Sequence, residues 1–226
     1  MRCRTTMADN STRIVIFGAG GLGREVLQAL RDQQRAGLPV ECVGFLVDPD
    51  FAGPAIVNGV PVHQDLAALA ADASVRFIVA VGNSVMRTRI TARIERLAGP
   101  RFATVVHPSS ILGDTVAVGS GSMILAATSV TTDARIGQHV LINPHVSIAH
   151  DCVLEDFVSL APAVTLAGDV HVEWGCEIGA AATVIPRQRI GRWAIVGAGA
   201  VVIKPVAANT TVAGVPAREV AHRGAD

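Results

Sequence analysis

A histidine followed directly by an aspartate, His150-Asp151, is the pair in this chain with the clearest capacity for chemistry. An exposed imidazole is the usual general base near neutral pH, and an adjacent carboxylate can orient it. On its own, a surface His-Asp dipeptide is more often a solvated ion pair. The surrounding pattern argues for more, because Asn143 precedes the pair and Gly168 follows it at a regular spacing. Two further histidines, His139 and His145, also lie close in the sequence.

Large aliphatic residues recur at every sixth position around this pair. From position 112 to position 202 every such residue is Leu, Ile or Val, and the residue four positions later is small or β-branched except at Gln188. A period of six suits a solenoid of short parallel strands, with one hexapeptide per face and three faces per coil. We therefore predict a parallel β-helix of about five coils, with the following inward residues: Leu112, Val118, Ile124, Val130, Ile136, Ile142, Ile148, Leu154, Leu160, Leu166, Val172, Ile178, Val184, Ile190, Val196 and Val202.

The repeat fixes how His150 and Gly168 relate to each other. His150 is two residues past the inward Ile148, so it should point away from the core. Gly168 is eighteen residues later, in the same phase and one coil further along. A carbonyl group could then lie near both, with the Gly168 N–H stabilising a developing oxyanion. The alternative is that Gly168 only eases a corner of the prism and that the array is a scaffold.

The region before the repeat has the pattern strand, glycine-rich turn, helix, strand. We predict a strand at 13–17, a turn containing Gly20, Gly21 and Leu22, a helix at 24–34 and a strand at 40–47 followed by Asp48. The helix N-terminus offers free N–H groups to a phosphate, and Asp48 could accept hydrogen bonds from a ribose or a base. The glycine turn suits any nucleotide diphosphate. The region has about a hundred residues and no second catalytic domain follows, so we reject a dehydrogenase.

Further elements complete this Rossmann-like unit. We predict a strand at 60–63, a short helix at 66–71, and a strand at 77–81 that leads into Gly82-Asn83. A helix at 84–97 and a last strand at 102–106 follow. Within that helix the apolar residues at helical spacing should belong to the core, namely Met86, Ile90, Ile94 and Leu97.

Composition narrows the function classes. The 226 residues include 19 basic and 19 acidic side chains and no tyrosine, which argues against nucleic acid or an anionic membrane as a partner. No apolar run has the length of a membrane span, and the start lacks a signal-peptide core, so we predict a cytoplasmic protein. Cys152 and Cys176 occupy small inward positions and should be buried space-fillers. We expect no metal site.

Several motifs occur together in this chain, namely Gly18 to Gly23, Gly82-Asn83, Asn143, His150-Asp151, Gly168 and the segment GVPAR at 214–218. Together they resemble the bacterial hexapeptide-repeat sugar O- and N-acetyltransferases, of the sialic-acid O-acetyltransferase and nucleotide-amino-sugar N-acetyltransferase type. The resemblance implies a left-handed β-helix, a homotrimer, acetyl-CoA as donor, and active sites between adjacent β-helices. It implies His150 as base, Asp151 as its orienting acid, Asn143 as a catalytic partner, and the Gly168 N–H as oxyanion donor.

The resemblance also implies where the donor and acceptor would bind. Small residues at Ala180, Gly197 and Ala198 match positions where the family's backbone contacts the pantetheine arm. Lys204 and Arg218, with Arg189 and Arg192, are candidates for the CoA phosphates. The acceptor-binding set would be Gly20, Gly21, Leu22, Asp48, Gly82 and Asn83.

Two positions depart from some family members. Leu22 replaces a histidine in the glycine turn, and Ser159 replaces a second histidine at the thioester end of the cofactor site. The acceptor could therefore be an amine or a hydroxyl. The predicted domains are a loose tail at 1–12, a Rossmann-like nucleotide-sugar-binding domain at 13–106, and a β-helix acyltransferase domain with its C-terminal tail at 107–220.

The predicted activity is acetyl transfer from acetyl-CoA to an amino or hydroxyl group of a sugar, free or nucleotide-linked. Two alternatives stay open. One is a non-catalytic trimeric scaffold that binds nucleotide sugars, and the other is an acetyltransferase for a small molecule that is not a sugar.

Overall fold

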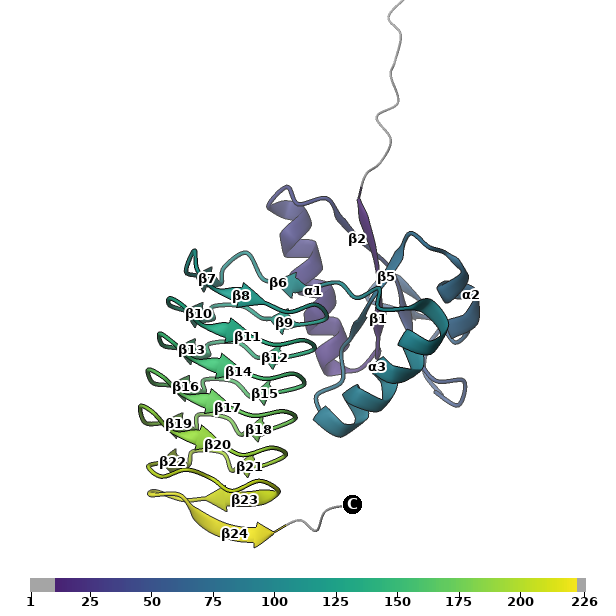
Figure 1. The fold of residues 1–226 in the computed structure, drawn as a ribbon. Helices are drawn as coiled ribbons and strands as arrows, with labels where there is room; N and C mark the ends of the chain where they lie inside the picture. Colours follow the sequence, from purple (N-terminus) through teal and green to yellow (C-terminus); the bar gives the residue numbers. More distant parts are fainter. Residues whose placement is uncertain (1–10, 223–226) are drawn as a thin grey trace, which may run out of the picture.

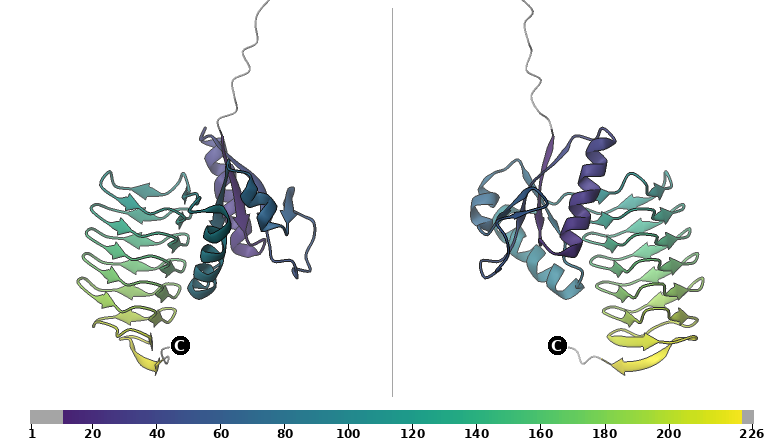
Figure 2. Two further views of the ribbon diagram at one scale, coloured as in Figure 1. Left: turned by 45° about the vertical axis from the view of Figure 1, so that its right-hand side comes forward. Right: turned by 180° about the vertical axis from the view of Figure 1, so that it is seen from behind.

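The chain folds into an α/β domain and a three-sided prism of parallel strands, which lie side by side (Figure 1). The computed structural model describes residues 11–222. Nearly all of the tail predicted at 1–12 therefore lies outside the described residues. Helices α1 (Gly21–Arg35) and α3 (Ser84–Ala98) are the parts of the α/β domain that lie next to the prism (Figures 1 and 2).

The α/β domain is built on a mostly parallel sheet with the strand order β3-β4-β2-β1-β5. Because side chains alternate along a strand, β1 directs Ile14 and Ile16 to the core that it shares with α1. Val15 and Phe17 face the opposite core, which contains α3. The strands are β1 (Thr12–Phe17), β2 (Val40–Leu46), β3 (Ile56–Val57), β4 (Val60–His63) and β5 (Val75–Val79), and the remaining helix is α2 (Leu66–Ala71).

The prism has three sheets, and from β6 to β22 the paired strands are parallel and eighteen residues apart, as Ile148 and Leu166 are, while β21 pairs with β23 at a spacing of sixteen. Sheet I contains β6 (Val105–Val106), β9 (Met123–Ile124), β12 (Leu141–Ile142), β15 (Ser159–Leu160), β18 (Glu177–Ile178), β21 (Ile195–Val196), β23 (Thr210–Ala213) and the antiparallel β24 (Arg218–His222). Sheet II contains β7 (Ile111–Leu112), β10 (Ser129–Val130), β13 (Ser147–Ile148), β16 (Thr165–Leu166), β19 (Thr183–Val184) and β22 (Val201–Val202). Sheet III contains β8 (Ala117–Val118), β11 (Arg135–Ile136), β14 (Val153–Leu154), β17 (His171–Val172) and β20 (Arg189–Ile190).

The chain turns from sheet I to II, from II to III and from III back to I, and we name the corners I–II, II–III and III–I accordingly. The residue before each small inward position commonly has a left-handed backbone, for example φ of 62° at His145 and 60° at Asp151. This conformation is unfavourable for most residues, but here it recurs at every coil because it produces the bend. The three histidines that are close in sequence therefore lie at three different corners: His139 at III–I, His145 at I–II and His150 at II–III.

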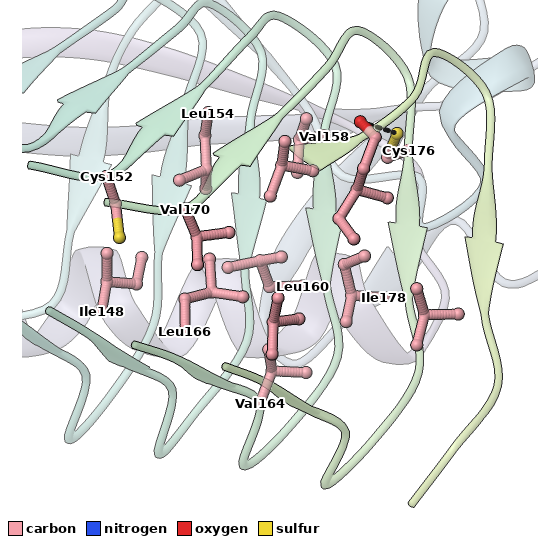
Figure 3. Close-up of a cluster of buried hydrophobic side chains, with 14 of the residues drawn as sticks. Ile148, Cys152, Leu154, Val158, Leu160, Val164, Leu166, Val170, Cys176 and Ile178 are labelled. Carbon is pink, nitrogen blue, oxygen red and sulfur yellow. Dashed lines mark hydrogen bonds between the residues drawn. The ribbon is translucent and has the colours of Figure 1, made fainter. Parts of the chain in front are cut away.

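The six-residue series forms the core of the prism, as predicted (Figure 3). Leu112 and Val118 in the first coil are only partly buried, and the other members of the series are all buried. Cys152 and Cys176 are fully buried among them, which confirms their prediction as space-fillers. Burial raises the pKa of the Cys176 thiol to about 12, so this side chain is a neutral, unreactive thiol.

The predicted strand at 102–106 is divided between the two parts of the molecule. Phe102 forms a bridge with Phe77 of the α/β sheet, whereas Val105–Val106 pairs with β9 of the prism. The chain changes sheets here because it must leave the first sheet to begin the first coil. Met123 and Leu141 on the outer side of sheet I join the core around α1, so the α/β domain covers the first coils of this sheet. The domain boundary at 106 stays a prediction.

Helix α3 does not bury all the apolar residues predicted for it. Ile90 and Ile94 are buried, but Met86 is 46% exposed and Leu97 is 56% exposed. The face of α3 next to the prism instead buries polar side chains, above all Arg87, which is 0% exposed. Its guanidinium group donates to backbone carbonyls of the prism, and this contact turns Met86 toward solvent.

Aromatic rings contact one another along corner III–I. The His139 ring stacks on Phe157 with 4.9 Å between centroids and meets the Phe102 ring edge-on at 4.5 Å. His139 is 2% exposed, and its Nδ1 atom has no hydrogen-bond partner among the described residues. Burial, and secondarily the charge of Arg87, lowers the pKa of His139 from 6.5 to about 4. The imidazole is therefore neutral in the folded protein at neutral pH.

We expect acid to weaken the fold through His139. Between its unfolded pKa of 6.5 and its folded pKa of about 4, the unfolded chain binds the proton and the folded chain does not. The free energy of unfolding should therefore fall by about 3 kcal/mol through this group as the pH drops through that window. Denaturant titrations above and below the window measure the change. In His139→Phe, which places at 139 the residue that occupies the next coil at 157, this part of the pH dependence should vanish. Equal pH dependence in both proteins would contradict the assignment.

Candidate active site at two corners of the prism

His150 lies on corner II–III with its ring exposed to solvent. Asp151 Oδ2 is 2.7 Å from His150 Nδ1, and each side chain is 60% exposed. A carboxylate can only accept, so Nδ1 carries the hydrogen and Nε2 is left as the basic nitrogen. The left-handed backbone of Asp151 turns its side chain back toward the ring. This arrangement suits a general base whose orientation is fixed by its neighbour.

Gly168 faces the basic nitrogen of His150. A Cβ atom placed on Gly168 would lie 2.5 Å from His150 Nε2, so a side chain at 168 would occupy the space beside the basic atom. The Gly168 carbonyl accepts from Arg187 N at 3.0 Å, while its N–H has no acceptor within the described part of the chain. The Gly168 backbone therefore lies beside the basic nitrogen of His150. The eighteen-residue spacing predicted this neighbourhood, and the structure contains it.

These residues line a hollow of about 540 Å³ with Asp151, Asp169, Pro186 and Arg187. Lys204 lies on the same corner two coils beyond Gly168, at the edge of a separate hollow of about 310 Å³ that also contains Arg218. Arg189 and Arg192 are directed elsewhere. Arg189 pairs with Glu173, and the Arg192 guanidinium lies 4.8 Å from the centre of the Trp174 ring.

The other predicted residues of the prism lie on corner I–II. Asn143, Ser159, Gly197 and Ala198 line a hollow of about 390 Å³, called here the corner cleft, together with Gly82 of the α/β domain. Ala180 is exposed on the same corner. The Asn143 amide nitrogen donates to Leu160 O at 2.8 Å, which leaves its Oδ1 atom available.

The Ser159 hydroxyl group is not free to bind a cofactor as predicted. It donates to Gly82 O at 3.1 Å and accepts from Arg87 Nη2 at 2.8 Å, and the residue is 8% exposed. Its position at the start of β15, beneath α3, makes it part of the contact between the two domains.

The predicted catalytic set is therefore divided within one chain. His150, Asp151 and Gly168 lie on corner II–III, whereas Asn143 lies on corner I–II. The strands of sheet II separate the two corners. Asn143 and His150 are seven residues apart, so they lie in consecutive turns of the chain, whereas a spacing of eighteen returns the chain to the same corner one coil further along.

The glycine turn lines a third hollow, of about 600 Å³, called here the glycine-turn cleft. Gly20 is the N-cap of α1, and Gly21 and Leu22 begin that helix, so free N–H groups face the cleft. Asp48 is on its rim, but its Oδ1 atom is 2.7 Å from Arg93 Nη1. Asp48 was predicted to accept hydrogen bonds from a ribose or a base, and in the structure its carboxylate is paired with Arg93.

Gly82 and Asn83 lie outside this third hollow. Gly82 lines the corner cleft, and the Asn83 side chain caps α3 by accepting from Met86 N at 2.9 Å. Its amide nitrogen also donates to Glu177 Oε1 at 3.2 Å. Sequence reasoning missed Arg87, Arg93 and Glu177 because no local pattern signals partners that lie tens of residues away.

Comparison with known proteins agrees with this architecture. Residues 13–94 match the family model described as the PglD N-terminal domain. A GDP-perosamine N-acetyltransferase of Escherichia coli O157:H7 is 36% identical over 124 residues, which are 54% of this chain and 55% of that protein. The crystal structure of PerB from Caulobacter crescentus, in complex with CoA and GDP-perosamine, superposes with a TM-score of 0.82 at 31% identity. That match covers 92% of this chain and 97% of the other.

The chain belongs to the hexapeptide-repeat sugar acetyltransferases. The acetyltransferase domain of PglB from Neisseria gonorrhoeae, in complex with acetyl coenzyme A, also matches, with a TM-score of 0.82, 26% identity, and coverage of 93% of this chain and all of that domain. Membership confirms the predicted family and fold class, an α/β domain followed by a left-handed β-helix. At the level of the family it also confirms an enzyme of the acetyl-CoA-dependent acyltransferase class.

The match to the curated relative spans about half the length of both proteins. Within residues 11–222, no helix has the length and apolar character needed to cross a membrane. The same residues contain no group of three or more His, Cys, Asp or Glu side chains that could hold a metal ion.

Proposed function

We propose that this protein transfers the acetyl group of acetyl-CoA to the amino group of a nucleotide-linked amino sugar, with His150 as general base. The observation that carries the proposal is the grouping of an oriented imidazole, a basic Nε2 atom and the Gly168 backbone on corner II–III. An amine acceptor on a nucleotide is supported by two relatives, one a GDP-perosamine N-acetyltransferase and the other solved in complex with CoA and GDP-perosamine. A cytoplasmic location, where acetyl-CoA and sugar nucleotides are available, is part of the proposal.

The proposed mechanism is direct transfer. The acceptor nitrogen attacks the thioester carbon while His150 Nε2 takes its proton, and the Gly168 N–H stabilises the oxyanion of the tetrahedral intermediate. The C–S bond then breaks, and the histidine returns the proton to the CoA sulfur. Asp151 holds the ring through Nδ1 throughout. Cys152 and Cys176 are buried, so they offer no exposed thiol for a covalent route.

The glycine-turn cleft is proposed to take the nucleotide diphosphate. N–H groups at the start of α1 would bind phosphate oxygens near Gly20, Gly21 and Leu22. The sugar would then extend past Gly82 toward the corner cleft. Ala180, Gly197 and Ala198 leave room there for a pantetheine arm, and Lys204 and Arg218 are the cations proposed for the CoA phosphates.

A homotrimer is proposed because one chain has only part of this arrangement at each corner. Sheet II, which joins corners I–II and II–III, presents uncharged outer residues: Ile111, Ser129, Ser147, Thr165, Thr183 and Val201. Sheet III instead carries charged side chains, and the first coils of sheet I are covered by the α/β domain. Packing sheet II against a neighbour about a three-fold axis would bring His150 of one chain opposite Asn143 of the next. Each cleft would thus have two walls and exclude water.

We expect purified protein to release thiol from acetyl-CoA when a nucleotide-linked amino sugar is supplied. The assay compares GDP-perosamine, a uridine-linked 4-amino sugar, and the matching sugar nucleotides with a hydroxyl in place of the amine, with mass spectrometry to identify the acetylated product. Thiol release with the amines and not with the hydroxyl analogues supports the proposal. If folded protein binds sugar nucleotides and releases no thiol with any of them, the scaffold alternative replaces it. If acetyl transfer occurs only to amino alcohols that are not sugars, the proposed acceptor is wrong and the small-molecule alternative replaces it.

A further inference from the structure

Arg87 is a completely buried cation at the junction of the two domains, and every bond that it makes is to a neutral oxygen. Its Nε atom donates to His139 O at 2.9 Å, on corner III–I. Nη2 donates one coil further along to Phe157 O at 2.8 Å and to Ser159 Oγ at 2.8 Å. A planar guanidinium can satisfy such divergent carbonyls at once, whereas an ammonium group cannot.

The remaining guanidinium nitrogen of Arg87 binds the α/β domain itself. Nη1 donates to Val81 O at 2.8 Å and to Gly82 O at 2.9 Å, at the carboxyl end of the central sheet. Gly82 O also accepts from Ser159 Oγ. On the next coil, Ser84 Oγ donates to Gly175 O at 2.9 Å, and Ser84 N donates to Glu177 Oε1 at 2.8 Å. The start of α3 is thus fastened along successive coils of the prism.

The segment that Arg87 holds connects two of the clefts. Ala80 and Val81 line the glycine-turn cleft, and the next residue, Gly82, lines the corner cleft with Asn143. A ligand that extends from the first cleft to the second would follow this backbone. A small shift of Val81–Gly82 against the prism would therefore misplace one end of the ligand relative to the other.

We propose that Arg87 is a positioning residue for the acceptor. It fixes the Val81–Gly82 segment on the prism, so that a sugar whose nucleotide is held in the α/β domain reaches the corner where acetyl transfer takes place. The inference rests on the proposed acetyl transfer. It assigns Arg87 no contact with acetyl-CoA, whose proposed contacts are on the prism alone.

The test compares Arg87→Lys, which keeps the charge but not the forked donors, with Arg87→Ala. We expect kcat/KM for the nucleotide amino sugar to fall about 10²-fold, because displacements of about 1 Å at a positioned substrate cost that much. KM for acetyl-CoA should change by less than about twofold. Methylguanidinium added to Arg87→Ala should restore part of the acceptor kcat/KM by filling the same site, a rescue that general destabilisation would not allow.

Gln33→Leu is the matched control. Gln33 is also buried, and its Nε2 atom donates to Val106 O at 2.8 Å, so it too joins the α/β domain to the prism, but far from Gly82. It should lower the unfolding temperature without raising KM for the acceptor. If Gln33→Leu and the Arg87 variants change both KM values alike, or if methylguanidinium fails to rescue, the positioning role is wrong and Arg87 is only an interface residue.

Binding measurements keep this inference separate from the proposed function. The affinity for the nucleotide amino sugar is measured by calorimetry in each folded variant. If the native chain binds it but transfers no acetyl group, and Arg87→Lys binds it more weakly than Gln33→Leu does, the proposed function fails while the positioning role stands. If all three bind equally and the native chain is active with an unchanged kcat/KM in Arg87→Lys, the positioning role fails alone.

Discussion

Replacing His150 with alanine is expected to lower kcat by about 10²–10⁴-fold, because the acceptor nitrogen loses the base that removes its proton. The fold should be unaffected, since the His150 side chain is 60% exposed, is paired with Asp151 and lies beside Gly168. Steady-state thiol release measures kcat, and calorimetry measures whether acetyl-CoA still binds. Circular dichroism and light scattering establish that the variant is folded and assembled like the native protein.

The matched control is His171→Ala. His171 also pairs with a carboxylate, Glu155 Oε1 at 2.8 Å. It lies on sheet III and does not line the hollow at His150 or the corner cleft. Loss of this partly exposed pair should leave kcat within about twofold of the native value, because such surface pairs contribute little to the stability of the fold. Near-normal turnover in folded His150→Ala would remove His150 from the mechanism. An equal loss in both variants would show that the effect is not specific to corner II–III.

Mixing two inactive variants is expected to restore activity if each cleft is built from two chains. His150→Ala removes the base on corner II–III, and Ala198→Trp blocks the corner cleft on corner I–II. In a trimer assembled at random from equal amounts, a cleft is intact when one chain supplies His150 and its neighbour supplies Ala198. This occurs in about a quarter of the clefts, so about a quarter of native activity should return from parents that are almost inactive.

A second pair tests the geometry directly. Gly168→Trp lies on the same corner of the same chain as His150, so mixing it with His150→Ala should restore nothing. Both mixtures are prepared by co-refolding, and light scattering must report three chains. Recovery in the second mixture and none in the first would contradict the division of the site described here. A fully active monomer would contradict the shared cleft altogether.

The sequence by itself determined the prism and the local chemistry on it. A period of six in aliphatic residues can be satisfied only by stacking short strands, so the inward series from Ile124 to Val202 was predictable residue by residue. The same period placed Gly168 one coil from His150, because eighteen residues return the chain to the same corner. Adjacent residues with complementary groups, such as His150 and Asp151, also need no tertiary information to be recognised.

The tertiary structure alone decided how the two domains meet, because that depends on contacts between residues far apart in the chain. The α/β domain packs against the first coils of sheet I and places Gly82 beside Asn143 in the corner cleft, whereas none of its residues lines the hollow at His150. Asp48 is paired with Arg93, forty-five residues away, and Ser159 with Arg87, seventy-two residues away. Helical spacing assigned Met86 to the core, but burial of the Arg87 guanidinium among prism carbonyls outweighs that pattern, because an unsatisfied buried cation would cost far more than an exposed methionine.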